Sequence, residues 1–374
     1  MTKSNIQLTS TISEDNKLTL ALQDLEIPQP GADEVVIRVE AAPLNPSDLA
    51  VLFSVADMST AKQSGTEQSP AITADVPAKF MPAVKTRVGK ATPVGNEGAG
   101  TVVAAGSSPA AQALMGKTVA VIGGGTYRQY LCANVQSCLV LKEGTTAKEG
   151  ASSFVNPLTA LAMVETMRAE GHKAIVHAAA SSLGQMLNRI CIADGVDLIN
   201  IVRKAEQETL LRDMGAKYVI NSSSETFLAD LTAAIIETGA TIAFDPIGGG
   251  KLTSDILNCM EVAASRDMTE HSVYGSDTFK QVYIYGALDR GPITLNRNFG
   301  FAWAVNGFLL FNALGKLGTK TVMGMRKRVA DEITTTFASK YTHEVSLAEA
   351  LQLKSIAAYS KQATGEKYLI TPQK

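Results

Sequence analysis

The stretch HKAIVHAAASSLGQMLNRICIADGVDLINIVRK, from His172 to Lys204, decides how this chain folds. Lys173 to His177 is an apolar run of strand length, and Gln185 to Ala193 carries apolar residues at roughly helical spacing. Asp194-Gly195 supplies a glycine suited to the left-handed cap that ends a helix. Val196 to Val202 is again strand-like, so the stretch predicts strand, tight turn, helix and strand in succession.

The turn between the first strand and the helix contains small side chains, apart from Leu183. Such a βαβ unit lets a pyrophosphate approach the backbone and lie at the positive end of the helix. On a G-x-G-x-x-G template the three glycine positions fall on Ala179, Ser181 and Gly184, so only the last is kept. Taken alone, the turn is equally compatible with an ordinary α/β crossover.

The end of the second strand holds two cations, Arg203 and Lys204. An acidic residue at this position would accept hydrogen bonds from a ribose 2′-hydroxyl, whereas cations favour a 2′-phosphate. The pair therefore predicts NADPH rather than NADH as the cofactor. The alternative is a solvated surface pair.

The patterns before and after about residue 148 differ. Before it, strands such as Glu34–Glu40 and Thr118–Ile122 predict a small all-β barrel, interrupted by a long polar segment from Ser54 to Thr92. A segment of that length is expected to be a lid, a binding loop or disordered. After it, strands and helices alternate, which predicts a doubly wound parallel sheet with helices on both faces.

Composition limits the class of protein. A chain of 374 residues with 45% hydrophobic and 19% charged residues is typical of a globular enzyme, and a net charge of −2 argues against nucleic acid as a partner. No secretory signal is apparent, and the most apolar window, Phe299 to Leu314, is too short for a membrane span. We interpret that window as buried sheet and interface. The four cysteines form no C-x-x-C pair, so we expect a cytoplasmic protein with reduced thiols.

Eight segments, in this order, resemble the medium-chain dehydrogenase/reductase superfamily, in its zinc-free quinone oxidoreductase and enoyl reductase branch. They are GADEVVIRVEAAPLNPSDL (Gly31–Leu49), PVGNEGAGTVVAAG (Pro93–Gly106), VNPLTALAMVE (Val155–Glu165), HAAASSLGQ (His177–Gln185), INIVRK (Ile199–Lys204), GAKYVIN (Gly215–Asn221), FDPIGG (Phe244–Gly249) and VYIYGAL (Val282–Leu288).

The resemblance implies an α/β fold made of a GroES-like catalytic domain and a Rossmann-type NADPH-binding domain. The first would span residues 1–148 together with 326–374, and the second residues 149–325. It also implies a homodimer joined through the edge of the cofactor-domain sheet, where the window Phe299 to Leu314 would lie.

The same resemblance argues against a metal. Zinc-dependent relatives have a cysteine where this chain has Asn45 and a His-Glu pair where it has Asn96-Glu97. Asparagine is a poor zinc ligand, so we expect no metal. Without a Lewis acid, a conjugated acceptor is the more plausible small-molecule substrate, because hydride addition spreads the developing charge over the conjugated system.

Cofactor-binding residues are carried over by position. The resemblance assigns the pyrophosphate to the turn and the 2′-phosphate to the cations, with further contacts from the fifth strand and the C-terminal part. The predicted set is Asn156, Ala180, Ser181, Ser182, Leu183, Gly184, Arg203, Lys204, Ser222, Tyr285, Gly286, Ala287, Leu288, Phe308, Leu310 and Lys367. Besides the surface pair for Arg203 and Lys204, alternatives stand for Asn156 as a helix cap, Tyr285 as a packed strand aromatic, Lys367 as a surface lysine, and Ser181 with Ser182 as residues that only tighten the turn.

The proton donor is the weakest part of the resemblance. Mitochondrial-type enoyl reductases carry a tyrosine at the position of Ala56, so that donor is missing here. Tyr127 is a candidate to replace it, although tyrosines in barrels mostly pack. Asn45 is predicted to hydrogen-bond a substrate oxygen, and His177 is expected to be a buried structural residue.

The sequence thus favours an NADPH:quinone oxidoreductase-like enzyme that reduces quinones or other enones. A 2-enoyl thioester reductase is an alternative within the enzymes. A non-catalytic NADPH-binding sensor is an alternative outside them, supported by the incomplete glycine pattern and the missing tyrosine.

Overall fold

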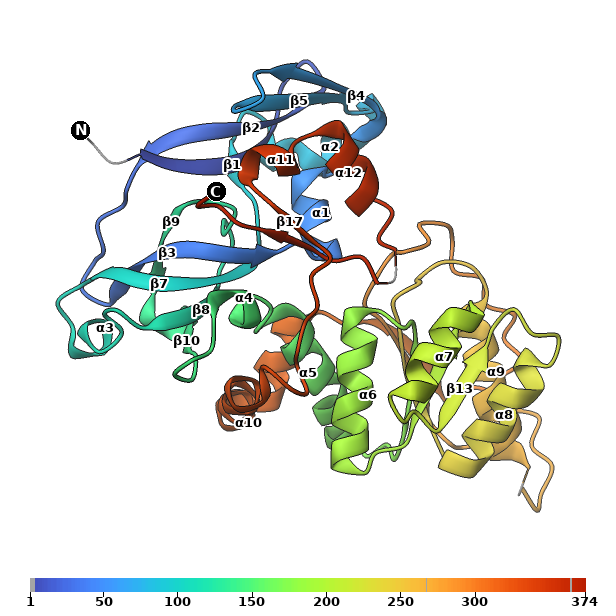
Figure 1. Cartoon of the computed structure of the whole chain (residues 1–374). Helices are drawn as coiled ribbons and strands as arrows, with labels where there is room; N and C mark the ends of the chain where they lie inside the picture. Colours follow the sequence, from blue (N-terminus) through green and yellow to red (C-terminus); the bar gives the residue numbers. More distant parts are fainter. Residues whose placement is uncertain (1–3, 267, 364) are drawn as a thin grey trace. The chain divides into compact units, whose positions relative to one another are not determined.

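The computed structural model describes residues 4–266, 268–363 and 365–374 (Figure 1). It divides into two compact units. The first contains the residues up to Val155 and those from Arg326 onward, and the second runs from Asn156 to Met325. The chain thus returns at its C-terminal end to the unit in which it begins. None of the helices in the described residues is long and apolar enough to span a lipid bilayer.

The first unit is built on two β-sheets. A five-stranded antiparallel sheet has the order β4-β5-β2-β1-β6, and a second sheet has the order β10-β8-β7-β3-β18-β17, with β9 also pairing with β3. The strands are β1 (Ser4–Ile12), β2 (Lys17–Glu26), β3 (Glu34–Pro43), β4 (Asp57–Gly65), β5 (Pro70–Asp75), β6 (Thr92–Pro93), β7 (Glu97–Ala105), β8 (Thr118–Ile122), β9 (Tyr130–Asn134), β10 (Cys138–Val140), β17 (His343–Val345) and β18 (Tyr368–Ile370).

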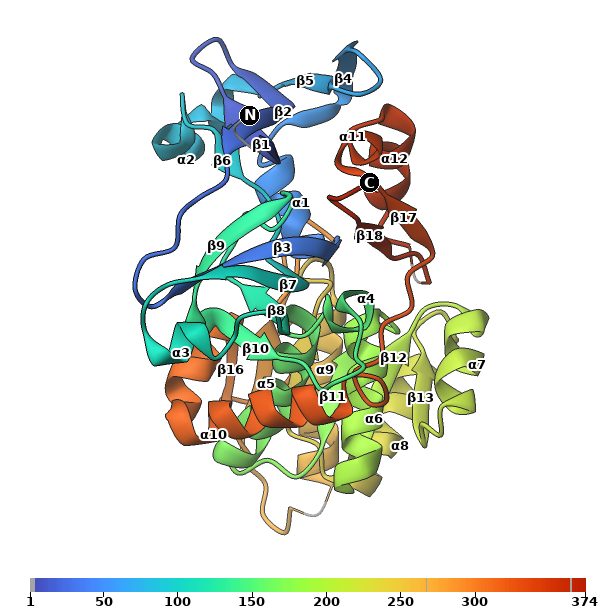
Figure 2. The same cartoon turned by 60° about the vertical axis from the view of Figure 1, so that its left-hand side comes forward.

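Short helices lie in the connections between strands. They are α1 (Pro46–Leu52), α2 (Met81–Val84), α3 (Pro109–Gln112), α4 (Ala147–Gly150), α11 (Leu347–Ala350) and α12 (Leu353–Tyr359), with 3₁₀ turns η1 (Ala78–Phe80), η2 (Lys85–Arg87) and η3 (Val135–Ser137). Strand β18 pairs antiparallel with β3, and Figure 2 shows β17 and β18 beside it. Alternating apolar residues of both sheets, such as Leu18, Leu20, Ile37 and Val39, form one buried core.

The polar segment from Ser54 to Thr92 was predicted as a long loop, and that prediction is wrong. Strands β4 and β5 form an antiparallel pair within it, and β5 adds this pair to β2. Ile72 and Ala74 alternate with more exposed residues in β5 and are buried against the core. This period-two pattern is short and lies among serines, glycines and prolines, which are typical of loops, so it was not recognised as a strand.

The second unit contains a six-stranded parallel sheet with the order β13-β12-β11-β14-β15-β16. This confirms the predicted doubly wound sheet. Its strands are β11 (Ile175–Ala178), β12 (Leu198–Val202), β13 (Tyr218–Asn221), β14 (Ile242–Asp245), β15 (Lys280–Ile284) and β16 (Trp303–Gly307). The helices are α5 (Val155–Ala169), α6 (Ser182–Asp194), α7 (Ala205–Asp213), α8 (Phe227–Thr238) and α9 (Leu252–Ser265).

The strand order reverses between β11 and β14, which are neighbours in the sheet but not consecutive in the chain. In open parallel sheets, ligands bind outside the carboxyl ends of the strands at such a switch point. The turn that follows β11 therefore begins at the point of this unit where a ligand is expected.

The window from Phe299 to Leu314 is less buried than the sequence predicted. Phe299 is in the core, but Phe301 is 78% exposed and Phe311 is 62% exposed. The window contains β16, an edge strand that pairs with β15 on one side, and no strand in the described part of the chain pairs with its other side. An edge position explains why an apolar sequence is left partly uncovered here.

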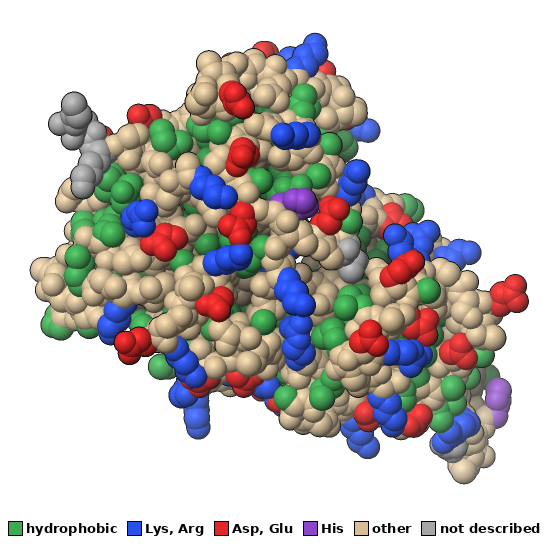
Figure 3. All heavy atoms as spheres, viewed as in Figure 1, with side chains coloured by type: hydrophobic (Ala, Val, Ile, Leu, Met, Phe, Trp, Pro, Cys, Tyr) green, Lys and Arg blue, Asp and Glu red, His purple; other side chains and the backbone are tan. Residues whose placement is uncertain are grey.

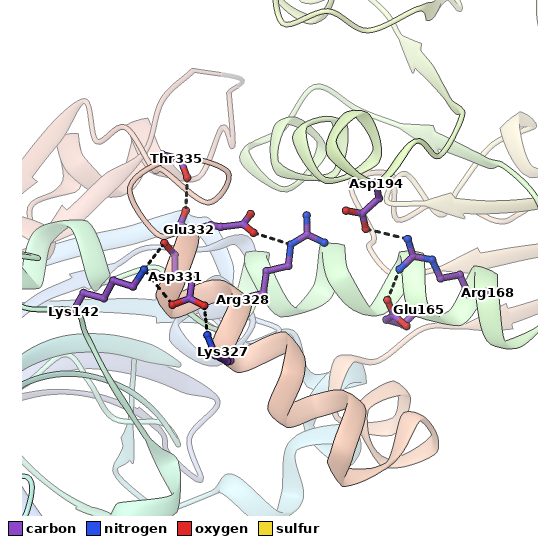
Figure 4. A network of polar contacts seen from close by, with 9 residues as sticks. All are labelled: Lys142, Glu165, Arg168, Asp194, Lys327, Arg328, Asp331, Glu332 and Thr335. Atoms are coloured by element: carbon purple, nitrogen blue, oxygen red, sulfur yellow. Dashed lines mark hydrogen bonds and ion pairs between the residues drawn. The ribbon is translucent and has the colours of Figure 1, made fainter.

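Helix α10 (Leu310–Glu332) belongs in part to each unit and is broken at Gly318, which has φ 79° and ψ 160°. Its last turns carry a set of ion pairs (Figure 4): Lys142 contacts Asp331 at 3.1 Å, and Arg328 contacts Glu332 at 3.2 Å. Arg326 donates to the carbonyl oxygens of Gln136 and Cys138. These bonds attach the C-terminal part of α10 to the first unit.

Candidate functional site

The turn after β11 is tightly constrained. Ala179, at the first glycine position of the template, has φ 118°, a conformation that residues with a Cβ rarely adopt. At the last position, a Cβ on Gly184 would lie 2.3 Å from the carbonyl oxygen of Ala179. Only glycine therefore fits where the helix packs on the turn, and the chain keeps glycine there. At the first position, by contrast, the chain has alanine, and the backbone of Ala179 is strained by its positive φ.

The start of α6 presents free hydrogen-bond donors. Ser181 is the N-cap, and its hydroxyl accepts from the amide of Gly184 at 3.2 Å. Within the described residues, the amides of Ser182 and Leu183 have no protein acceptor. Two unpaired amides at the positive end of a 13-residue helix, next to a turn of small residues, fit a pyrophosphate.

The two predicted cations lie at the carboxyl end of the neighbouring strand β12. Arg203 and Lys204 are both exposed, and neither side chain forms an ion pair with any residue that the structure describes. The hydroxyl of Ser223 donates to the carbonyl oxygen of Arg203 at 3.0 Å, which holds the segment after β13, including Ser222, beside the cations. The adjacent strand ends thus bring together the three residues predicted around a 2′-phosphate.

Tyr285 follows β15 and forms a pair with His177 of β11. The Tyr285 hydroxyl and His177 Nε2 are 2.7 Å apart, and the two rings stack with centroids 5.9 Å apart. Burial lowers the pKa of His177 to about 4, so the ring is neutral at physiological pH. His177 is therefore a buried residue, as expected, and Nδ1 has no hydrogen-bond partner in the described part of the chain.

Other predicted cofactor residues occupy varied positions in the second unit. A Cβ on Gly286 would lie 2.4 Å from the carbonyl oxygen of Pro246, so only glycine fits there, while Ala287 and Leu288 beyond it are exposed. Phe308 packs edge-on against Phe244 and Tyr283. Asn156 lies in the first turn of α5 instead of capping it, and Leu310 begins α10.

A second group of polar residues is buried in the first unit, around Glu97. Its carboxylate accepts from Asn45 Nδ2 at 2.8 Å and from the backbone amides of Phe154 and Val155 at 2.8 and 3.0 Å. Burial raises the pKa of Glu97, and Lys367 and these donors act to lower it. Because its oxygens are already bonded, this carboxylate holds the structure together rather than being free to bind a ligand.

Asn45 and Asp48 belong to the same group. The Asp48 carboxylate accepts hydrogen bonds from the backbone amides of Asn45 and Asn96 at 2.7 and 2.8 Å. Burial raises the pKa of this carboxyl to about 7. The amide nitrogen of Asn45 is used by Glu97, while its buried Oδ1 has no partner among the described residues. In this arrangement Asn45 Oδ1 can accept a hydrogen bond from a ligand, and Glu97 uses one of the two N–H donors of Nδ2.

Lys367 is buried, with only 7% of its surface exposed, so the surface-lysine alternative is wrong. Its ammonium donates to the hydroxyls of Ser152 at 2.8 Å and Ser339 at 3.3 Å. The Ser152 hydroxyl is also 2.9 Å from that of Tyr341. Burial lowers the pKa of Lys367 to about 8, whereas Glu97 and Asp48 raise it. The position between β17 and β18 explains the burial, because β18 enters the sheet beside β3.

Tyr127, the candidate proton donor, has no exposed surface, and its hydroxyl donates to the carbonyl oxygen of Pro43 at 3.0 Å. Burial raises its pKa well above the ordinary value. To act as an acid the hydroxyl would have to leave this bond. The structure gives it a packing role beside the loop of Asn45, and catalysis by Tyr127 stays a prediction.

Sequence reasoning missed Ser152 and Tyr341. No motif marks either residue, and they lie 189 positions apart in the chain. Glu97 was noted only as the partner of Asn96 in a zinc comparison. In the residues that the structure describes, no group of three or more His, Cys, Asp or Glu side chains could hold a metal ion.

Comparison with known proteins places this fold among reductases. No family model matches the chain. A mitochondrial enoyl-[acyl-carrier-protein] reductase of Xenopus tropicalis is 27% identical over 286 residues, which cover 74% of this chain and 68% of that protein. The corresponding Mus musculus protein is 25% identical, over 75% of this chain and 65% of its own length. The matched part thus spans about two thirds of these relatives.

Solved structures agree with this placement. A Mesorhizobium loti protein proposed to be an NADPH:quinone reductase superposes with a TM-score of 0.72 at 26% identity, covering 100% of this chain and 99% of that one. A mutant enoyl thioester reductase of Candida tropicalis has the same fold, with a TM-score of 0.66 at 21% identity, covering 99% of this chain and all of the other. With a Rossmann-type unit and a GroES-like unit, the chain has the fold of the medium-chain dehydrogenase/reductase superfamily, and it resembles the quinone reductases and enoyl reductases of that superfamily.

Proposed function

We propose that this protein is an NADPH-dependent oxidoreductase that transfers a hydride to a quinone or another conjugated carbonyl compound without a metal. One observation carries the cofactor assignment: two exposed cations without ion-pair partners in the described residues lie at the end of β12, next to the strand that leads into the phosphate-binding turn. A similar structure is proposed to be an NADPH:quinone reductase, which supports the same cofactor.

When bound, NADPH supplies the hydride. The residues that would hold it are the amides of Ser182 and Leu183 at the pyrophosphate and Arg203 with Lys204 at the 2′-phosphate. The backbone of Gly286 to Leu288, at the carboxyl end of β15, is proposed to contact the nicotinamide. Asn156, Phe308, Leu310 and Lys367 remain proposed contacts on the strength of the family resemblance.

The acceptor follows from the polar groups around Asn45. Asn45 and the pair Asn96-Glu97 stand where zinc-dependent relatives have a cysteine and a His-Glu pair. Here Asn45 donates to Glu97, which also accepts from the backbone amide of Phe154. Asparagine is a poor zinc ligand and the Glu97 carboxylate is already hydrogen-bonded, so we favour a conjugated acceptor, whose developing charge is spread over several atoms.

A 2-enoyl thioester reductase is the second candidate. The relatives of Xenopus and mouse are named enoyl-[acyl-carrier-protein] reductases, and a solved neighbour is an enoyl thioester reductase. An enoyl thioester is itself a conjugated carbonyl compound, so the same site serves both reactions. Ala56, at the position of the family's tyrosine, disfavours this candidate.

NADPH oxidation at 340 nm against a benzoquinone, a simple enone and an enoyl-CoA separates these functions. Turnover of the quinone and the enone, with the enoyl-CoA slower, is expected. A marked preference for enoyl-CoA would establish the second candidate. Tight NADPH binding with no oxidation by any acceptor would mean a non-catalytic NADPH-binding protein and would overturn the proposal.

We also propose a homodimer that forms through β16. Phe301, two residues before this edge strand, and Tyr274 are both exposed, and their ring centroids are 6.0 Å apart. Burial of these rings together with strand pairing would stabilise a two-fold contact. Light scattering coupled to gel filtration tests this, and a monomer at micromolar concentration would contradict it.

A further inference from the structure

The proposed reaction needs a proton as well as a hydride, and the family's tyrosine is absent. Of the tyrosines in the first unit, Tyr127 is completely buried and bonded to a backbone carbonyl. Tyr341 differs from it in two respects. It is only partly buried, and its hydroxyl oxygen is bonded to a side chain that leads to a buried lysine.

The hydrogen bonds form a continuous chain of three polar groups. The Tyr341 hydroxyl is 2.9 Å from the Ser152 hydroxyl, which accepts from the Lys367 ammonium at 2.8 Å. Ser339 accepts from the same ammonium at 3.3 Å. The ammonium also lies over the ring of Tyr341, 5.3 Å from its centroid. Ser152 and Lys367 are buried, and Tyr341 is the most exposed of the three, so we assign the contact with the acceptor to Tyr341.

We propose that Tyr341, Ser152 and Lys367 form a proton relay, in which Tyr341 protonates the reduced acceptor and the Lys367 ammonium restores the tyrosine proton through the Ser152 hydroxyl. This inference rests on the proposed reductase function. Tyr341 is the catalytic residue in it, and Ser152 and Lys367 act through Tyr341.

The step balances as follows for an enone. The β-carbon gains a hydride while the nicotinamide is oxidised, which leaves an enolate. The enolate then forms a C–H bond at its α-carbon with the proton of the Tyr341 hydroxyl. The phenolate takes the proton of the Ser152 hydroxyl, and Ser152 takes one from the Lys367 ammonium. Neutral Lys367 regains its proton from solvent.

The order of acidities drives each transfer in this direction. Burial lowers the pKa of Lys367 to about 8 and raises the pKa of Tyr341 above its ordinary value. The lysine is thus the stronger acid and can reprotonate the tyrosine. An enolate carbon is far more basic than a phenolate, so protonation by Tyr341 is also favourable. The hydroxyls of Ser152 and Ser339 favour the ionised form of Tyr341.

The charged groups that surround the lysine set its state. Glu97 at the start of β7 and Asp48 in α1 both favour the protonated form. Among the described residues, the ammonium of Lys367 forms hydrogen bonds with the hydroxyls of Ser152 and Ser339 and no ion pair with either carboxylate. The two carboxylates therefore favour the protonated form of Lys367 without forming an ion pair with it, so the ammonium can still donate its proton, as a relay requires.

The test compares Tyr341→Phe with wild type on two acceptors. With the enone, kcat should fall about 100-fold, as loss of a general acid predicts. With the quinone, kcat should stay within about twofold, because water can protonate the hydroquinone oxygens. NADPH affinity, measured by fluorescence titration, should be unchanged. Tyr359→Phe is the matched control, since this buried tyrosine donates to the carbonyl of Ala350 outside the relay.

The pH profile supplies a readout that a merely structural role would not alter. In wild type, kcat for the enone should fall as pH rises through about 8, because the relay is loaded only when Lys367 is protonated. Lys367→Met and Ser152→Ala should each lower kcat and remove this limb, and Lys367→Arg should shift it to higher pH.

Two results would overturn the relay: enone kcat in Tyr341→Phe within twofold of wild type, or an alkaline limb that persists in Lys367→Met. Both leave the reductase function standing, since wild type would still oxidise NADPH. Failure of wild type to bind or oxidise NADPH would instead contradict the proposed function itself.

Discussion

The buried residue His177 makes the stability of the fold depend on pH. Its ring is neutral in the folded protein, because burial lowers its pKa from 6.5 to about 4. In the unfolded chain it binds a proton below pH 6.5. Its contribution to stability is therefore complete above pH 6.5 and is lost as pH falls toward 4.

We predict that His177→Gln makes the protein less sensitive to acid. At pH 5.5, protonation of this histidine in the unfolded chain costs the wild type about 1.4 kcal/mol, or about 4 °C in Tm for a unit of this size. The drop in Tm between pH 8 and pH 5.5, measured by calorimetry, should shrink by about that amount in the variant. His271→Gln removes an exposed histidine and serves as the control. An equal drop in His177→Gln and wild type would show that burial of His177 does not control this dependence.

For single residues, sequence motifs predicted which side chains belong to the candidate site, but they did not predict which of these side chains are buried. Arg203 and Lys204 follow a strand, and their exposure could be expected from that position. Lys367 has no such signal, since a lysine near the end of a chain is usually solvated. It is buried because β18 inserts beside β3, more than 300 residues away in sequence. The contact of Lys367 with Ser152 was beyond prediction for the same reason.

Among the elements, α10 depends most visibly on a single side chain. Arg326 donates 2.8 and 2.7 Å hydrogen bonds to the carbonyl oxygens of Gln136 and Cys138, and its guanidinium lies 5.4 Å from the centroid of the Phe154 ring. These contacts hold the helix after the break at Gly318 against the first unit. Lys327, the next residue, is exposed and forms an ion pair with Asp331 within the helix (Figure 4).

Arg326→Ala should lower the free energy of unfolding by about 2 kcal/mol, since it removes two charge-assisted hydrogen bonds and a packed side chain. Lys327→Ala should change it little, because exposed ion pairs contribute little. Urea unfolding followed by circular dichroism compares the two variants. Equal effects would mean that Arg326 does not attach the helix.

Elements with a strong local pattern were predictable, and those defined by pairing were not. The alternation of strands and helices after residue 148 predicted the parallel sheet, because each βαβ unit has its own period. Strands β4 and β5 were missed because β4 is largely exposed and shows no sustained alternation of buried and exposed residues. The exposure of Phe301 was missed because an apolar window does not show whether a strand is central or at an edge.

For the molecule as a whole, charge is distributed without a dominant sign. Lysine and arginine side chains alternate with aspartate and glutamate over the face drawn in Figure 3, in keeping with a net charge of −2. The eight ordered segments predicted a resemblance to the superfamily, and the comparisons with known proteins confirm that resemblance. The sequence could not point to the proton donor that we propose, because that proposal depends on contacts between residues 152, 341 and 367.

Arg203 and Lys204 are proposed to bind the 2′-phosphate of NADPH, and the assignment of the cofactor site depends on this contact. Fluorescence titration of wild type and of the double variant Arg203→Ala with Lys204→Ala, with NADPH and NADH, measures this directly. We predict that NADPH affinity falls about 100-fold, as expected for two lost charge-assisted contacts, while NADH affinity stays within about twofold. Lys316→Ala with Lys320→Ala, two exposed cations of α10, should change neither affinity. An unchanged preference for NADPH in the Arg203–Lys204 variant would contradict the account.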